Sequence, residues 1–202
     1  MAADPHPRLH NLLAALALNL GEETTAALER ASGLTGAAAT GLLALEEFLG
    51  DAHVGRLADV LGLTHSGAVR LVTQLEREGL AVRRTGDDRR RVEVRLTARG
   101  RARARAAREA RDAVVRQATG GLTGAEADTL EVLLDKLVTA RVESRVESRV
   151  ESRVESRVES RAERRRAGEP GGWWCRTCDF AACGRPEGRC PAQVTAARVF
   201  SE

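Results

Sequence analysis

The stretch from Val54 to Leu96 restricts the fold more than any other part of the chain. It first predicts two short helices, because apolar residues recur at three- and four-residue spacing on either side of Gly62, which permits a tight turn. Thr64 is placed to cap the second helix and Gly79 to end it. The apolar positions are Val54, Leu57, Ala58 and Leu61 in the first helix and Val69, Val72 and Leu75 on the inner face of the second. This is the pattern of a helix-turn-helix, although an ordinary antiparallel helix pair would give the same pattern.

Two short strands follow these helices directly. Residues 80–84 and 92–96 alternate apolar with polar side chains, as half-buried strands do, and the segment TGDDRRR between them holds a glycine and two aspartates at a turn. Arginines gather on this hairpin, at Arg83, Arg84, Arg89, Arg90, Arg91 and Arg95. A hairpin with a basic tip directly after a helix-turn-helix is a wing, which favours a winged helix-turn-helix over an ordinary helix pair.

Two helices are predicted before this segment. The first has one apolar stripe at helical spacing, formed by Leu9, Leu12, Leu13, Leu16 and Leu20. Thr35 is placed to cap the second helix, which Gly50 ends.

Two more helices are predicted after the hairpin. Thr97 caps the first, which Gly120 and Gly121 end. Thr123 caps the second, with Glu126 three residues on as in a capping box. The last helix has a broad apolar face that needs a partner, made of Leu130, Val132, Leu133, Leu137 and Val138. The predicted fold class is therefore mainly α with a small β-wing, extended by a helical region, a repeat spacer and a small cysteine-rich knuckle.

The composition indicates a soluble, cytoplasmic protein with no membrane partner. Of the 202 residues 43% are hydrophobic and 30% are charged, and the longest apolar run, LLAALALNL, is too short to span a bilayer.

Lys136 is the only lysine among 32 basic residues. Because this bias looks like codon usage in a GC-rich genome, the abundance of arginine by itself does not indicate nucleic-acid binding.

Residues 141–160 are five perfect copies of the tetrapeptide RVES. On an α-helix a four-residue period turns each valine by about 40° from the last, so no continuous apolar seam forms, and the period matches no coiled coil. Residues four apart also carry like charges, which repel weakly. We interpret this segment as a spacer, up to ~30 Å long if it is fully helical. The alternative is that the repeat forms a rod-like segment dedicated to binding a partner.

All four cysteines lie beyond the repeat, in the spacing C-x2-C-x4-C-x6-C, at Cys175, Cys178, Cys183 and Cys190. Four thiolates this close in a reducing compartment are the ligand set of tetrahedral zinc or of an iron–sulfur cluster. We expect structural zinc, which favours the C-x2-C pair. The loose last spacing and the Cys-Pro step at residues 190 and 191 keep an iron–sulfur cluster open, and redox-active thiols without a metal are a third interpretation.

The order of predicted elements over residues 9–141 resembles the MarR family of winged-helix transcriptional regulators. The resemblance is carried by LADVLGLTHSGAVRLVTQLEREGLAVRR and by DDRRRVEVRLTARG, which fits the wing pattern of the family at Asp88, Arg90, Val94, Leu96, Thr97 and Gly100. It implies a sequence-specific DNA-binding regulator, a ligand- or redox-responsive repressor, that is not an enzyme.

The resemblance also implies which residues contact DNA. The outer face of the second helix of the pair would lie in the major groove, where Arg70 can read guanine and Gln74 adenine. Arg90 would enter the minor groove, oriented by Asp88. Gly67 stands where the family more usually has a hydroxyl residue. The expected DNA-binding residues are Thr64, Ser66, Gly67, Arg70, Thr73, Gln74, Asp88, Arg89, Arg90 and Arg91.

The family dimerises through its first and last two helices, so the resemblance implies a homodimer on a pseudo-palindromic operator in double-stranded DNA, with a small-molecule effector as a further partner. The expected domains are residues 1–34 (dimerisation helix), 35–100 (winged helix-turn-helix), 101–140 (dimerisation helices), 141–172 (spacer and hinge) and 173–202 (knuckle).

The alternative function is a thiol- or metal-based redox protein, or a metal carrier, that uses the winged helix for protein contacts. The histidines lie at positions 6, 10, 53 and 65, none of them near a cysteine in the sequence, and no nucleophile with its base can be assembled. If the knuckle is a sensor, we expect it to dock back on the body of the protein. A spacer whose length is loosely constrained cannot transmit a conformational change to the recognition helices by rigid coupling.

Overall fold

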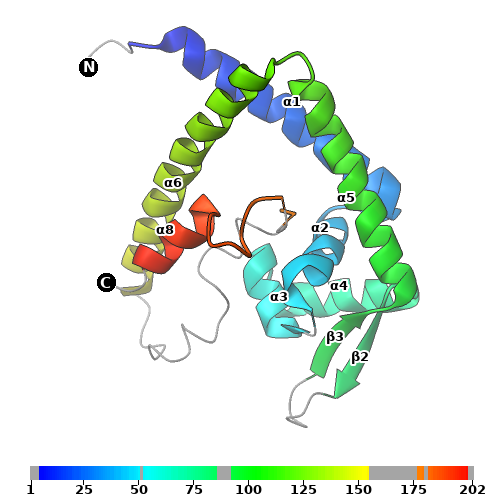
Figure 1. Ribbon diagram of the computed structural model, residues 1–202. Helices are drawn as coiled ribbons and strands as arrows, with labels where there is room; N and C mark the ends of the chain where they lie inside the picture. Colours follow the sequence, from blue (N-terminus) through cyan, green and yellow to red (C-terminus); the bar gives the residue numbers. More distant parts are fainter. Residues whose placement is uncertain (1–4, 51, 86–91, 155–176, 180–181, 200–202) are drawn as a thin grey trace.

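The computed structural model describes residues 5–50, 52–85, 92–154, 177–179 and 182–199 (Figure 1). The helices are α1 (Pro7–Ser32), α2 (Ala37–Ala44), the π-helical turn η1 (Leu45–Leu49), α3 (Val54–Leu61), α4 (His65–Arg77), α5 (Ala98–Thr119), α6 (Gly124–Val154) and α8 (Pro191–Val199). The strands are β1 (Ala52–His53), β2 (Ala81–Thr85) and β3 (Val92–Leu96). The predicted fold class, mainly α with a small β-wing, is confirmed.

The main core lies where α2, α3 and α4 meet the small sheet. Leu42, Leu57, Val72, Leu75 and Leu80 are all fully buried there. Each buried side chain of this size contributes about 1.5–3 kcal/mol through removal of apolar surface from water. This packing fixes α4, the second helix of the helix-turn-helix, against the rest of the domain.

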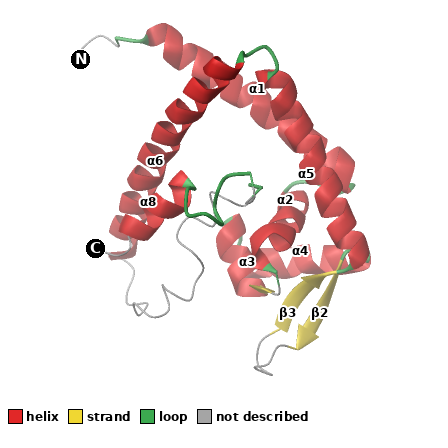
Figure 2. Ribbon diagram, in the orientation of Figure 1, coloured by secondary structure: helices red, strands yellow, loops and turns green. Residues whose placement is uncertain are grey.

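The sheet has the strand order β1-β3-β2, with both pairs antiparallel (Figure 2). In the hairpin, Ala81 pairs with Leu96 and Thr85 with Val92, so the two predicted wing strands are confirmed. The third strand, β1, pairs Ala52 with Val94. The sequence did not predict β1 because two residues are too few to show an alternating pattern.

Most of the predicted helix ends are confirmed. The hydroxyls of Thr64 and Thr97 accept hydrogen bonds from the backbone N–H groups of Gly67 and Gly100, at 3.1 and 3.0 Å. At the start of α6, the N–H of Thr123 donates to the carboxylate of Glu126 at 2.8 Å, and the N–H of Glu126 donates back to the Thr123 hydroxyl at 3.4 Å. This is the reciprocal pair of a capping box.

Two details of the prediction are wrong. Thr35 does not cap α2, because Gly36 takes the cap position with a positive φ of 55° and the carboxylate of Glu29 accepts its N–H at 2.6 Å. Val69 does not lie on the inner face of α4 and is 37% exposed. The buried stripe of α4 is Ala68, Leu71, Val72 and Leu75, and a residue directly after Ala68 is turned about 100° away from it.

Outside the core, the long helices form an open frame. α1 packs along α5, whereas α6 turns away after Gly120 and Gly121 and runs down the opposite side of the molecule (Figure 1). Among the described elements α6 packs extensively only against α8, a helix that the sequence analysis did not predict. Within the described residues no helix is long and apolar enough to cross a membrane.

Candidate functional site

The outer face of α4 is the first candidate site. Thr64, Ser66, Arg70 and Gln74 are exposed there, while Gly67 and Thr73 are half-buried. The predicted major-groove residues therefore come together on one surface of α4, opposite its buried stripe. Backbone and hydroxyl bonds fix the start of the helix, where the hydroxyls of Thr64 and Ser66 lie 3.2 Å apart.

Arg83 on β2 ties the wing to this helix. Its backbone N–H donates to Glu76 at 3.1 Å, its guanidinium forms an ion pair with the same carboxylate, and its Nη2 donates to the hydroxyl of Thr73 at 3.0 Å. The Thr73 hydroxyl donates in turn to the carbonyl oxygen of Val69 at 2.9 Å. Arg83 thus positions α4 against the wing, and the hydroxyl of Thr73 already takes part in this network.

The wing is also fixed where it meets α5. The hydroxyl of Thr97 donates to the Gly79 carbonyl at 2.9 Å, and its N–H donates to the Leu80 carbonyl at 2.9 Å. A Cβ atom on Gly100 would lie only 2.0 Å from that carbonyl oxygen of Leu80. The Leu-Thr-x-x-Gly pattern at residues 96–100 is therefore a packing motif. Its glycine lets the first turn of α5 pack directly against the backbone of Leu80.

The tip of the wing lies outside the described residues. This applies to four of the predicted DNA-binding residues, Asp88, Arg89, Arg90 and Arg91, which stay predictions. On the described part of the hairpin, Arg84 and Arg95 are exposed.

The second candidate site is the cysteine-rich tail. Cys178, Cys183 and Cys190 form no disulfide in the part of the chain that the structure describes, and they pack together with Val138 and Val142 of α6. Cys190 is only 4% exposed. Cys175 lies outside the described residues, so its place in the cluster rests on the sequence spacing.

Tight turns wrap the chain around these thiols. Gly184 and Gly188 both have positive φ values, 69° and 68°, and the N–H of Arg189 donates to the Gly184 carbonyl at 2.8 Å. Cys190 directly precedes α8, whose first residue is Pro191.

The thiol of Cys183 lies in an environment that favours its protonated form. Burial is the main cause that raises its pKa to about 11, and the neighbouring Cys190 and Cys178 raise it further. Next to Cys190 lies Arg185, whose pKa is lowered by burial and raised by that sulfur. Among the described residues, no group of three or more His, Cys, Asp or Glu side chains could hold a metal ion.

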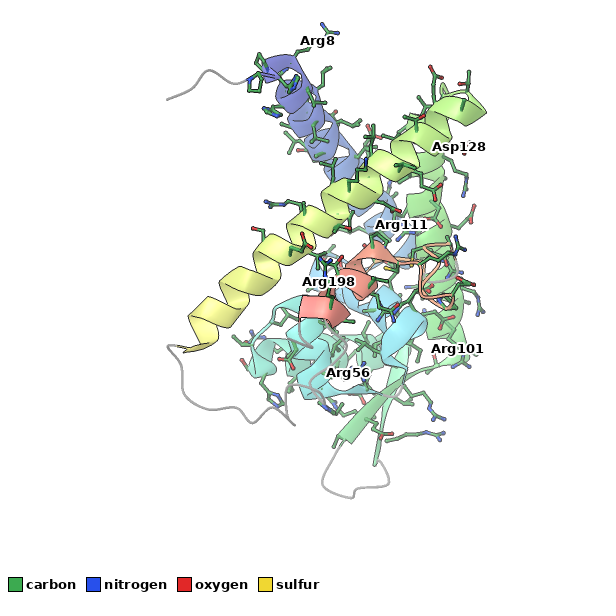
Figure 3. All side chains as sticks on the ribbon, turned by 60° about the vertical axis from the view of Figure 1, so that its left-hand side comes forward. Arg8, Arg56, Arg101, Arg111, Asp128 and Arg198 are labelled. Carbon is green, nitrogen blue, oxygen red and sulfur yellow. The ribbon has the colours of Figure 1, made fainter. Side chains whose placement is uncertain are left out.

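The tail is docked between two parts of the protein. On one side Arg198 of α8 forms an ion pair with Glu143 of α6 (Figure 3). On the other side the Arg108 Nε atom on α5 lies 3.9 Å from the Asp179 carboxylate, and Arg108 also forms an ion pair with Glu47 of η1. Although burial opposes it, the charges of Glu47 and Asp179 raise the pKa of Arg108.

These docking residues were not predicted from the sequence. Arg108 lies in an arginine-rich helix and Asp179 in a loop, so no spacing connects them. A sensing tail was expected to dock back on the body, and the described part of the tail does lie against α5 and α6. The RVES segment was interpreted as a spacer, yet Val142 and Glu143 of its first copy form part of the docking surface.

Two apolar surfaces remain exposed. One runs along the first half of α1, at Leu9, Leu12, Leu13, Leu16 and Leu18, and the other along α6, at Val132, Leu133, Leu134 and Leu137. They overlap the stripes predicted from the sequence. Leu18 and Leu134 were not predicted, and the predicted Leu20, Leu130 and Val138 are half-buried.

Comparisons with known proteins agree with this geometry. Residues 32–91 match the sequence pattern of the MarR family. None of the curated proteins compared with the chain matches it.

Solved structures with the same fold extend the match beyond those residues. A MarR family protein from Bacillus stearothermophilus is 27% identical, with a TM-score of 0.58, over 67% of this chain and 96% of that one. Two structures are similar in fold at lower identity. RV1404 from Mycobacterium tuberculosis is 22% identical, with a TM-score of 0.59, over 68% of this chain and 94% of that one. MepR, a transcription regulator of the Staphylococcus aureus multidrug efflux pump MepA, is 21% identical, with a TM-score of 0.56, over 64% of this chain and 95% of that one.

Proposed function

We propose that this chain is a transcription regulator of the MarR family, and that it acts as a homodimeric repressor on a pseudo-palindromic operator in double-stranded DNA. The observation that carries the proposal is the outer face of α4. That face presents Arg70 and Gln74 to solvent on a helix held by a buried stripe and by the wing. A helix held in this way can enter a major groove without first becoming ordered.

The side chains on α4 suit base recognition. An arginine can donate two hydrogen bonds to guanine, and a glutamine can pair with the edge of adenine. Thr64 and Ser66, at the start of the helix, lie where hydroxyls and backbone N–H groups reach phosphates. The arginines of the wing tip, Arg89, Arg90 and Arg91, are proposed to contact the neighbouring minor groove or backbone.

Dimerisation would cover the two exposed apolar surfaces. Leucines and valines on α1 and α6 are exposed in a single protomer, and a contiguous apolar surface of this kind favours a protein partner. A second copy of the chain presents the same surfaces in a symmetric arrangement. The two α4 helices of such a dimer would read half-sites about one helical turn apart.

Control by a small-molecule effector or by redox state is the finer part of this proposal. A ligand or an oxidation that alters the spacing of the two α4 helices would change operator affinity, because the dimer must contact both half-sites at the same time.

The experiment is selection of a DNA duplex from a random pool by the full-length protein, followed by measurement of its Kd. Arg70→Ala should weaken binding of the selected duplex by about 1–3 kcal/mol, the typical discrimination from one bidentate base contact. Arg116→Ala removes the same charge from an exposed position on α5 and is the matched control. Equal affinities for both variants, or no enrichment of any sequence, would contradict the proposal.

The alternative, a thiol-based redox protein or metal carrier, predicts a different outcome. In that case no sequence would be enriched, and replacement of Arg70 would leave metal content and thiol reactivity unchanged.

A further inference from the structure

The first half of α5 is rich in arginine. Side chains of this kind usually lie in solvent, but here each of them contacts a different element of the protein. The residues are Arg99, Arg101, Arg103, Arg105 and Arg108. Two of the five, Arg99 and Arg103, bind the C-terminal ends of other helices, and they carry the inference that follows.

Arg99 binds the end of α4. Gly79 ends that helix in the left-handed region, with a φ of 66°, and its N–H donates to the carbonyl of Glu76 at 2.9 Å. The Nη1 atom of Arg99 donates to the carbonyl of Glu78, directly before the glycine, at 3.0 Å. The C-terminal end of a helix carries partial negative charge, so a guanidinium there stabilises it.

Arg103 binds the end of α1 in the same way. Gly33 has a φ of 66°, and its N–H donates to the carbonyl of Glu29 at 2.9 Å. The Nη1 atom of Arg103 donates to the carbonyl of Ser32, directly before that glycine, at 2.9 Å. Ser32 is fully buried, so this bond lies partly inside the protein.

Both guanidinium groups lie close to the glycine that ends the helix. A Cβ atom on Gly33 would lie 3.0 Å from Nη1 of Arg103, and one on Gly79 would lie 3.5 Å from Nη1 of Arg99. Each glycine therefore permits the left-handed turn and leaves space for the arginine. We call these two contacts the arginine clasps.

The arginine clasps join two helices that have different roles in the proposed function. Residues four apart lie on the same face of a helix, so Arg99 and Arg103 hold α4 and α1 on successive turns of α5. α1 packs along α5 (Figure 1), and its Leu28 lies in a small buried cluster with Ala107 of α5. The position of α1 relative to α4 is therefore set through α5.

We propose that Arg99 and Arg103 are positioning residues for DNA binding, which fix the α4 helix relative to the dimerisation helix α1. This inference rests on the proposed function, in which α1 contributes to the dimer interface and each α4 reads one half-site. In such a dimer the arginine clasps set the distance between the two α4 helices before DNA is bound. Less ordering is then needed when the dimer contacts both half-sites.

The first test follows hydrogen exchange in the full-length protein without DNA. Loss of a clasp should let the last turn of its helix open more often. Arg103→Ala should therefore speed exchange in residues 29–34, and Arg99→Ala in residues 76–80, while each leaves the other end unchanged. Arg116→Ala is the control, because its partner Glu109 lies on α5 itself. Unchanged exchange at both helix ends would overturn the arginine clasps.

The second test compares two duplexes, the full selected operator and a duplex with a single half-site, at a temperature where every variant is folded. Arg99→Ala and Arg103→Ala should each weaken binding of the full operator about three- to tenfold, the range expected for one partly exposed hydrogen bond. Binding of the half-site duplex should stay within twofold of the parent, because the winged helix itself is unchanged. Arg70→Ala should weaken binding of both duplexes, and Arg116→Ala of neither.

The same data separate positioning from a direct contact with DNA. An arginine that binds a phosphate contributes about 0.9 to the slope of log K against log salt concentration, whereas a positioning residue leaves the slope unchanged. A slope lowered by that amount, equal losses on both duplexes, or an unchanged affinity for the full operator would each overturn the positioning role.

Lysine variants guard against misfolding of the alanine variants. Arg99→Lys and Arg103→Lys keep a positive donor at each helix end and should recover part of the affinity for the full operator. Failure of the parent protein to bind any duplex would contradict the proposed function and with it the role in DNA binding. The exchange experiment would still decide whether the arginine clasps hold the two helix ends.

Discussion

The guanidinium of Arg83 on β2 donates a hydrogen bond to the hydroxyl of Thr73 on α4 across 3.0 Å. Together with its ion pair to Glu76, this bond joins the wing to the helix that we propose reads DNA. The two elements can therefore meet the double helix as one rigid unit.

Replacement of Arg83 should loosen that unit. For Arg83→Ala we expect a decrease of about 1 kcal/mol in the free energy of unfolding, the usual contribution of one hydrogen bond. Arg84→Ala, at the next and exposed position of β2, should change it by less than about 0.5 kcal/mol, as surface substitutions usually do. Urea unfolding followed by circular dichroism measures both values, and equal effects would show that the Arg83 network does not stabilise the wing.

Gly100 should tolerate no side chain. In the Gly100→Ala variant the new Cβ would lie 2.0 Å from the carbonyl oxygen of Leu80, so α5 or the end of α4 must move. We expect a loss of about 1–3 kcal/mol or more, typical of overpacking. Gly124→Ala is the control, because its Cβ would meet nothing within 4 Å at the start of α6. That variant should be neutral or slightly stabilised in thermal unfolding, and a stable Gly100→Ala protein would contradict the close approach.

The sequence predicted those parts of the fold that local chemistry determines. The caps at Thr64 and Thr97 and the capping box at Thr123 each depend on groups three residues apart, so the pattern is visible in the sequence. The apolar stripes of α3 and α4 are local in the same sense. Thr35 failed as a cap because Glu29, in the preceding helix, reaches Gly36.

The candidate site was predictable to a smaller extent. The exposed face of α4 follows from helical periodicity, so Arg70 and Gln74 could be assigned to it. The role of Arg83 depends on Thr73 and Glu76, which meet it only after β2 has folded against α4. The docking of the tail joins Arg108 to Asp179, far apart in the chain, and no local pattern contains that contact.

A charge on the exposed face of α6 should prevent dimerisation. Leu133→Glu would place a carboxylate in the centre of the apolar surface, and burial of an unpaired charge is costly. Asp128→Lys alters a charge on another face of α6 and is the control. Sedimentation velocity should show a monomer for Leu133→Glu and a dimer for Asp128→Lys. A dimer of unchanged affinity in both would place the interface elsewhere.

The capping box of α6 should make part of the stability depend on pH. Hydrogen bonds from the Thr123 N–H and hydroxyl lower the pKa of Glu126. The carboxylate therefore stabilises the folded state fully above the ordinary glutamate pKa of about 4.3, and this contribution is lost as the pH falls through the lowered pKa. Glu126→Gln removes the charge, so its Tm should lie below that of the parent at pH 7, and the difference should shrink as the pH falls through the lowered pKa of Glu126. A difference that stays the same over the whole acid range would show that the charge contributes nothing.

The length of the RVES repeat should matter little, even though its first copy is part of the docking surface. Because the copies are identical, deletion of any two leaves a valine at position 142 and a glutamate at position 143. Between Val142 and Cys178 the chain would still have 27 of its 35 residues. At up to about 3.3 Å per residue, that is ample to return to α6. We expect the dimerisation affinity and the Kd for the selected duplex to remain within twofold of the parent, measured by sedimentation and titration. A loss of dimerisation or DNA affinity would contradict the spacer interpretation and show that the repeat sets a functional length.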